Sequence, residues 1–212
     1  MLADLYFRKG EYKNAAGWYS IADRKGHADA QYMLGTIHHH GLGLPRNYER
    51  AHAYFLKAFQ NGKSTAGTNI GCCYHFGLGV KQDYKRAIKY YMAAAKCGDF
   101  NAQYYIGLLY EHGDGVEMSA QQALEWYERT AVNGNMYAQY NTGRFYKKGF
   151  GMPKDPLEAL KWYTMSANQG FSFAKERVLW LNQKGHFLPQ DKKGKQKKKV
   201  YIFHHERLTW HK

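Results

Sequence analysis

Two short stretches of the chain hold residue types that could do chemistry. Residues 38–40 are three consecutive histidines, and they are followed directly by Gly41-x-Gly43. Imidazoles are common metal ligands, and paired glycines can open a phosphate-binding loop. Residues 72–75, with the letters CCYH, form a second group with potential metal or thiol chemistry. A third interpretation of the glycines is that they only turn the chain.

The glycine pair recurs along the chain, which decides among these interpretations. The pairs are Gly41/Gly43, Gly77/Gly79, Gly113/Gly115 and Gly149/Gly151, at a constant step of 36 residues. We call the set of equivalent positions in successive units a column. Two further columns keep the same step and hold one residue type each, namely Ala30, Ala66, Ala102, Ala138 and Ala174, and Gly35, Gly71, Gly107 and Gly143. A phosphate loop occurs once per domain and not once per repeat. The glycines are therefore architectural, and the chain is a repeat protein.

The first half of each unit predicts a helix. In NAQYYIGLLYEHGDGV, residues 101–116, the apolar side chains follow the spacing of one helix face. Gly107 lets a neighbouring helix approach closely. Gly113 then ends the helix, because glycine accepts the left-handed conformation found at helix C-termini.

The second half of each unit predicts another helix with its own start signal. Residues that favour the N-cap position share one column, Asn47, Asp83, Ser119 and Asp155. Ser119-x-x-Gln122 and Asp155-x-x-Glu158 also predict capping boxes. Aromatic pairs then supply bulk at fixed positions, Trp18-Tyr19, Tyr54-Phe55, Tyr90-Tyr91, Trp126-Tyr127 and Trp162-Tyr163.

Taken together, these columns identify a family resemblance. The segment GTNIGCCYHFGLGVKQDYKRAIKYYMAAAKCG resembles the Sel-1-like repeat, a relative of the tetratricopeptide repeat, almost column for column. The resemblance covers residues 1 to about 184 and implies an all-α fold, a right-handed α-solenoid of antiparallel helix-loop-helix units. It also implies an adaptor or scaffold role, without indicating a particular partner.

The period divides the chain into units. We expect a solenoid over residues 1–184, with a shortened first unit 1–27, full units 28–63, 64–99, 100–135 and 136–171, and a capping helix 172–184. The start is either a natural cap or part of a longer chain. Residues 185–212 form a basic tail that we expect to be partly disordered, with a lysine-rich run at 192–199.

The candidate chemistry fits packing better than catalysis. His38 takes the place of a tyrosine in the other units, which predicts partial burial, and Cys73 lies in an apolar column typical of the core. Histidines in matching columns lie on helices about 10 Å apart, too far to share one metal ion. The sequence also lacks the motifs of the common hydrolases, nucleotide-binding enzymes and metalloproteases. We therefore expect no metal site, no cofactor and no enzymatic activity.

Composition and charge limit the cellular setting. The net charge is +14, and eight Lys and Arg residues stand against two carboxylates from Gly185 onward. No apolar run is long enough for a membrane span, and the N-terminal residues predict no signal peptide. Three cysteines do not form a disulfide framework, so we expect a cytoplasmic location. The run Lys192–Lys199 is either a solvated tail, a signal of the nuclear-import type, or a contact for nucleic acid or acidic membrane.

The predicted binding surface is a stripe on the first helices whose residues differ between units. Its candidate partner-binding residues are Asn69, Asn101, Tyr105, His112, Tyr137, Asn141, Arg144 and Lys148. By resemblance to the tetratricopeptide family, these helices line the concave groove. The asparagine amides suit a peptide backbone, whereas Arg144 and Lys148 suit a carboxylate or phosphate. The units 100–135 and 136–171 are expected to form a basic end that recognises an acidic group.

These features favour a non-enzymatic adaptor that binds a protein or peptide segment, expected to be acidic, in the concave groove. No small-molecule substrate is expected. One alternative is a regulatory or targeting subunit of an enzyme complex. Another is binding of nucleic acid or acidic membrane through the basic body and the tail.

Overall fold

The computed structural model describes residues 2–187, and every regular element in this range is an α-helix. The helices follow one another in the order α1 (Leu2–Arg8), α2 (Tyr12–Asp23), α3 (Ala28–His40), α4 (Tyr48–Gln60), α5 (Ala66–Phe76), α6 (Tyr84–Lys96), α7 (Phe100–His112), α8 (Ala120–Val132), α9 (Met136–Lys148), α10 (Pro156–Asn168) and α11 (Ser172–Gln183). Consecutive helices pack against each other along the whole row. The prediction of an all-α solenoid is confirmed.

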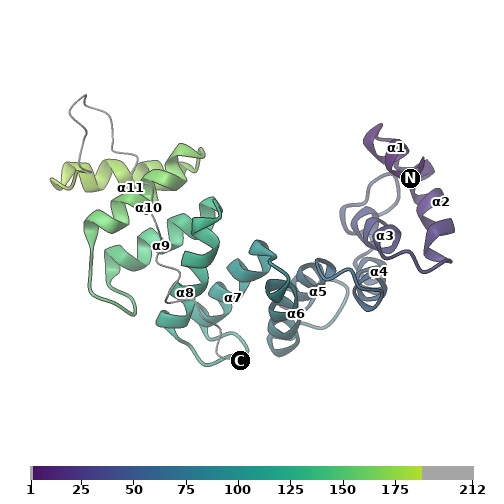
Figure 1. Cartoon of the computed structure of the whole chain (residues 1–212), viewed down its shortest axis with the longest axis horizontal. Helices are drawn as coiled ribbons and strands as arrows, with labels where there is room; N and C mark the ends of the chain where they lie inside the picture. The colour runs from purple at the N-terminus through teal and green to yellow at the C-terminus, as the bar shows by residue number, and fades with distance from the viewer. Residues whose placement is uncertain (1, 188–212) are drawn as a thin grey trace.

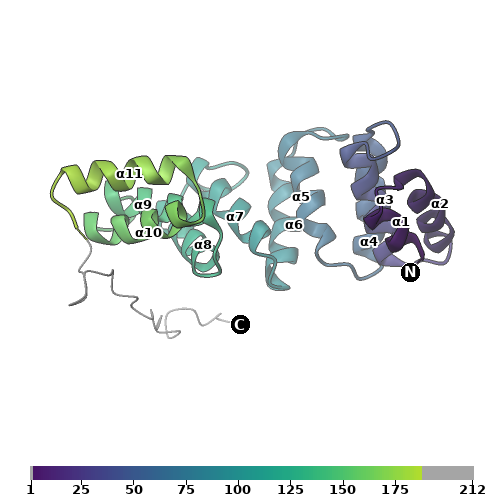
Figure 2. The same cartoon turned by 90° about the horizontal axis from the view of Figure 1, so that it is seen from above.

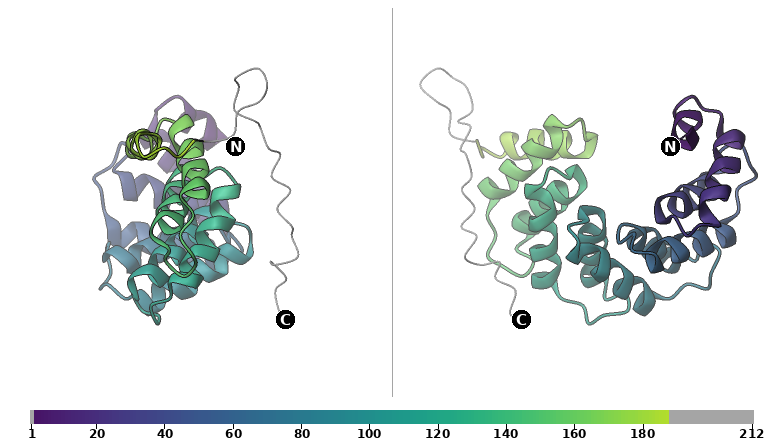
Figure 3. Two further views of the ribbon diagram at one scale, coloured as in Figure 1. Left: turned by 90° about the vertical axis from the view of Figure 1, so that its left-hand side faces the viewer. Right: turned by 45° about the vertical axis from the view of Figure 1, so that its right-hand side comes forward.

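The row of helix pairs bends into an arc (Figure 1). The odd-numbered helices lie toward the inside of the arc and the even-numbered helices toward the outside. Figure 2 shows the same row from above, and Figure 3 shows the open side of the arc. The first helix of each unit therefore faces the concave side, as the resemblance implied.

The predicted helix boundaries are confirmed at both ends. Each of the four expected N-caps accepts a hydrogen bond from a backbone N–H in the first turn of its helix, Asn47, Asp83, Ser119 and Asp155. The four first glycines of the pairs end their helices in the left-handed conformation, with φ between 69° and 76°. The sequence thus predicts where the first helix of each full unit ends and where its second helix begins.

The predicted capping boxes are only half formed. Ser119 and Asp155 cap their helices as expected, but the reciprocal bonds are replaced by other contacts. The Gln122 amide donates to Glu125 at 3.5 Å, and Glu158 pairs with Lys161. The backbone N–H groups of Ser119 and Asp155 donate instead to the carbonyls of Tyr110 and Tyr146, each at 2.9 Å, so neither is free for the reciprocal bond.

Inside each unit, a glycine of the first helix receives a large ring from the second. The ring opposite Gly107 is Tyr127, and a Cβ added at this glycine would lie 2.7 Å from it. The other units repeat the arrangement, with Phe55 at Gly35, Tyr91 at Gly71 and Tyr163 at Gly143. Each of these rings is almost completely buried. Close approach of the paired helices therefore depends on the absence of a side chain at one column, as predicted for Gly107.

The second glycine of each pair has a different role. Gly115 has a φ of 70°, and a Cβ added there would lie 2.7 Å from the backbone of Tyr84 in the preceding unit. Gly151 has the same relation to Gln121. The loop of each unit thus rests on the first turn of the second helix before it, so this glycine sets the distance between units.

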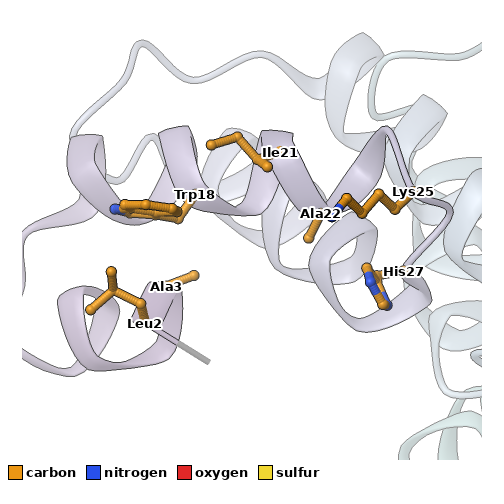
Figure 4. A pocket seen from close by; sticks show the side chains of 7 residues that line it. All are labelled: Leu2, Ala3, Trp18, Ile21, Ala22, Lys25 and His27. Atoms are coloured by element: carbon orange, nitrogen blue, oxygen red, sulfur yellow. The ribbon is translucent and has the colours of Figure 1, made fainter.

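The two ends of the described row differ from its middle. Trp126 and Trp162 are buried against the preceding unit, whereas Trp18, in the same column, is 45% exposed because no helix pair precedes it in this structure. Trp18 lines a shallow pocket with Leu2 and Ile21 (Figure 4). At the other end, α11 carries the exposed Leu179 in the column where complete units have glycine. Beyond residue 187, the predicted basic tail lies outside the described residues.

Candidate functional site

The first histidine of the stretch is buried, whereas His39 is half-buried and His40 is exposed. His38 is 6% exposed, and its ring stacks on Tyr54 with centroids 5.7 Å apart and an interplanar angle of 4°. Tyr74 stacks on Tyr90 in the same way one unit later, at 5.8 Å and 10°. His38 therefore replaces a tyrosine in a repeated stacking pair, as predicted. Burial also lowers its pKa, so the ring is neutral near pH 7.

The second chemical group is equally enclosed. Cys73 is 1% exposed, which confirms its prediction as core, and burial raises the pKa of its thiol to about 12. The hydroxyl of Tyr91 lies 3.4 Å from both the Cys72 sulfur and His75 Nδ1. A protonated thiol is a poor nucleophile and a poor metal ligand. Between residues 2 and 187, no group of three or more His, Cys, Asp or Glu residues could hold a metal ion.

The predicted partner-binding residues all lie on α5, α7 or α9, but they differ in accessibility. Four are exposed, Asn101, His112, Tyr137 and Lys148. Three are half-buried, Asn69, Tyr105 and Arg144, and Asn141 is buried. The exposed and half-exposed members give the inner side of the arc a surface that is polar and aromatic. The buried members need another explanation.

The asparagine amides take part in stacking between units. Asn69 Nδ2 donates to the hydroxyl of Tyr32 on the preceding first helix at 3.3 Å. Burial raises the pKa of Tyr104, and Asn141, 37 residues later, lies close enough to the Tyr104 hydroxyl to oppose that shift. Asn141 itself is 8% exposed. The expectation that these amides are free for a peptide backbone is therefore wrong for Asn141 and only half right for Asn69. Each joins neighbouring inner helices.

Arg144 is also held within the chain. Its Nη2 lies 2.5 and 2.6 Å from the two carboxylate oxygens of Glu111, which also accepts a hydrogen bond from Tyr127 at 2.7 Å. The side chains of Arg144 and Glu111 are only 27% and 12% exposed. Arg144 therefore connects α9 to α7, and its guanidinium is already occupied, although the sequence suggested it for a carboxylate or phosphate of a partner. Lys148 remains accessible.

Phe76, whose ring contacts Tyr105 on the inner side, was not among the predicted residues. Phe76 is 53% exposed, and its ring lies 6.1 Å from Tyr105, which in turn stacks on Tyr91 at 5.1 Å. Phe76 stands in the column of His112 and Lys148 and ends α5. Its place in that variable column is a sequence signal that could have identified it.

The charge of the two C-terminal full units is not uniform. Unit 100–135 holds five carboxylates and one arginine, whereas unit 136–171 holds five Lys and Arg residues and two carboxylates. The prediction that both units form a basic end is therefore wrong for unit 100–135. Excess positive charge on the inner side begins at α9.

Comparison with known proteins identifies the family to which this repeat architecture belongs. The family model described as "Sel1 repeat" matches residues 28–63, 67–99, 101–135 and 137–171. The chain belongs to the Sel1 repeat family. The four matches begin at residues 28, 67, 101 and 137. A comparison of the sequence with curated proteins gave no match.

Solved Sel1 repeat structures have the same architecture. The chain is similar to c5321, a protective antigen of uropathogenic Escherichia coli with an SLR fold, at 30% identity and a TM-score of 0.79. That match covers 85% of this chain and only 40% of the antigen, so the chain spans less than half of the longer protein. A Sel1 repeat protein from Oxalobacter formigenes also has 30% identity and a TM-score of 0.79, with 90% and 78% coverage. A sel1 repeat protein from Klebsiella pneumoniae, at 23% identity and a TM-score of 0.56, shares the fold.

Membership in the family carries a general functional statement. Sel1 repeats are commonly scaffolds for protein–protein interaction and typically have no enzymatic activity. In the part of the chain that the structure describes, no helix combines the length and the apolar character needed to cross a membrane.

Proposed function

We propose that this Sel1 repeat protein is a non-enzymatic adaptor that binds a segment of a partner protein along the inner side of its arc. The observation that supports the proposal is the contrast between two sets of columns on the first helices. The packed columns repeat from unit to unit, whereas the accessible inner positions carry unrelated side chains, Asn101, His112, Tyr137 and Lys148 among them. Positions that vary and remain accessible are available for recognition.

The inner surface offers the contacts that a protein segment requires. The exposed ring of Phe76 beside Tyr105 provides apolar contact area near the middle of the arc. Aromatic residues of this kind often supply much of the binding energy at interfaces. Asn101 and His112 flank them on α7 and can exchange hydrogen bonds with a backbone. A cytoplasmic location is part of the proposal, supported by three cysteines that are all unpaired.

The test compares the two sides of the arc. A partner is captured from the source organism with the full chain, purified, and its dissociation constant measured for two double variants. Asn101→Ala with His112→Ala changes the inner side, and Lys89→Ala with Gln121→Ala is the matched change on α6 and α8. All four residues are exposed.

We expect the inner double variant to weaken binding about tenfold, the effect of losing two hydrogen bonds of about 0.7 kcal/mol each. The outer double variant should leave the affinity unchanged. If only the outer double variant weakened binding, the partner would bind the outer side and the proposal would be wrong. Loss of affinity in both variants with unaltered folding would show that the partner surrounds the arc.

A further inference from the structure

A group of positive side chains lies where α9 meets α11 at the C-terminal end of the inner side. Lys147 and Lys148 end α9, and Arg177 lies in the middle of α11. Lys148 is exposed, and the other two are partly exposed. Within residues 2–187, none of the three forms an ion pair with a carboxylate within 4 Å.

The repeat register explains why these charges lack a partner. Glu111 of α7 pairs with Arg144 of α9, 33 residues later. The same step from Lys147 leads to Trp180, and Lys147 Nζ lies 3.9 Å from the centre of that ring. A lysine thus occupies the position of the glutamate, and an indole occupies that of the arginine. The equivalent contact between units places a cation on an aromatic face and leaves its charge without an anion.

Arg177 faces Tyr140 of the neighbouring helix α9. The Tyr140 hydroxyl lies close enough to the guanidinium to raise the pKa of Arg177. The pKa of Lys147 is lowered, first by partial burial and then by the positive charges of Arg177 and Lys148. Lys147 Nζ lies 3.9 Å from the centre of the Trp180 ring, and Trp180 follows Arg177 by three residues on the same helix, so the charges lie close together. An anion placed among them would gain from all three.

We propose that Lys147, Lys148 and Arg177 form a subsite for a carboxylate-rich segment of the partner protein. This proposal rests on the proposed function and names the part of the inner surface that selects acidic sequence. It replaces the pair Arg144 and Lys148 expected from the sequence, because Arg144 already holds Glu111.

The chemistry of the subsite fits a protein segment with acidic side chains. A guanidinium binds a carboxylate through two parallel hydrogen bonds. A lysine ammonium adds a second positive charge that attracts a carboxylate from any direction. Trp180 is 39% exposed, so its ring offers an apolar platform directly beside the cations. A segment that alternates carboxylates with apolar side chains would contact both features.

The test uses the full chain and defined probes. A fluorescein-labelled peptide with six glutamates and two leucines is compared with the same peptide carrying glutamines, by fluorescence anisotropy at low and moderate salt. A labelled thymidine oligonucleotide serves as the nucleic-acid probe. The variant Lys147→Gln with Arg177→Gln is compared with Lys85→Gln with Lys89→Gln on α6, which removes the same charge from exposed residues on the outer side. Circular dichroism verifies the helical content of each protein.

We expect the glutamate peptide to bind at least tenfold more tightly than the glutamine peptide, with binding weakened by salt. The Lys147/Arg177 variant should lose about tenfold in affinity, and the Lys85/Lys89 variant less than twofold. Equal losses in both variants would overturn the proposal in favour of general charge attraction. An oligonucleotide that binds more tightly and responds to the same variant would assign the site to nucleic acid.

The purified partner separates this proposal from the one it rests on. A partner that loses affinity on Asn101 and His112 substitution but not on Lys147 and Arg177 substitution would keep the inner surface and remove the acidic subsite. A partner that binds both double variants with full affinity would contradict both the inner binding surface and the acidic subsite.

Discussion

Replacement of Gly107 by alanine should destabilise the solenoid, although alanine favours helices. Gly107 lies inside α7, and the Cβ of an alanine would lie 2.7 and 2.8 Å from Cε1 and Cδ1 of Tyr127. The Tyr127 ring cannot move away easily, because it is fully buried, packs at 5.5 Å on Phe145, and donates its hydroxyl to Glu111. The helices must therefore separate, or the hydrogen bond to Glu111 must break.

The magnitude follows from two opposing effects. Alanine gains about 1 kcal/mol over glycine in a helix interior, because it loses less backbone entropy on folding. Overpacking of a tight core contact costs roughly 1–3 kcal/mol, and loss of the buried hydrogen bond adds about 1 kcal/mol. We expect a net loss of about 1–3 kcal/mol in the free energy of unfolding.

Gly17→Ala is the matched control. Gly17 lies inside α2, and a Cβ added there would meet no other atom within 4 Å. The same substitution should therefore stabilise the protein by up to about 1 kcal/mol. Urea denaturation followed by circular dichroism at 222 nm measures both variants. Equal effects of the two substitutions would refute the argument that ring-to-glycine packing sets the spacing within each unit.

Three further predictions concern the contacts between units and the tail. In a double-mutant cycle of Glu111→Gln and Arg144→Met, urea denaturation should give a coupling of about 1–2 kcal/mol, and additive effects would show that the ion pair does not join α7 to α9. Burial lowers the pKa values of His38 and His52, so the unfolded chain binds protons first and stability should fall as the pH drops below 6.5. His38→Tyr, which restores the residue of the other units, should reduce that loss between pH 7.5 and 5.5. Deletion of residues 190–212 should leave the helical content per residue of the body unchanged by circular dichroism, and a collapse would show that the tail belongs to the core.

The repeat period made most of the fold predictable. A position such as Gly107 or Ser119 is supported by equivalent residues in other units, so one chain supplies several independent observations of the same local requirement. Helix ends, N-caps and the glycine contacts could therefore be predicted. The capping boxes were overpredicted because the backbone N–H groups of Ser119 and Asp155 donate to carbonyls of the preceding helix.

The binding surface was harder to predict, because a variable column need not be free. Arg144 stands in a column with Thr36, Cys72 and Leu108, which suggested no packing role. Its partner Glu111 occupies another variable column, and the two residues match each other only in this pair of units. Such a pairing depends on the step of 33 residues between neighbouring inner helices. The sequence alone does not give this offset, because it depends on how neighbouring inner helices are arranged in the arc.

The central claim is that a partner segment lies along the inner side of the arc, and site-specific crosslinking tests it most directly. A photoreactive phenylalanine replaces either Tyr137 on α9 or Lys89 on α6, both of which are exposed, and each variant is illuminated in cells of the source organism. The account predicts that the Tyr137 position forms a crosslink to one discrete protein, which excess unlabelled chain removes, whereas the Lys89 position forms none. A competable crosslink from Lys89 with none from Tyr137 would contradict it.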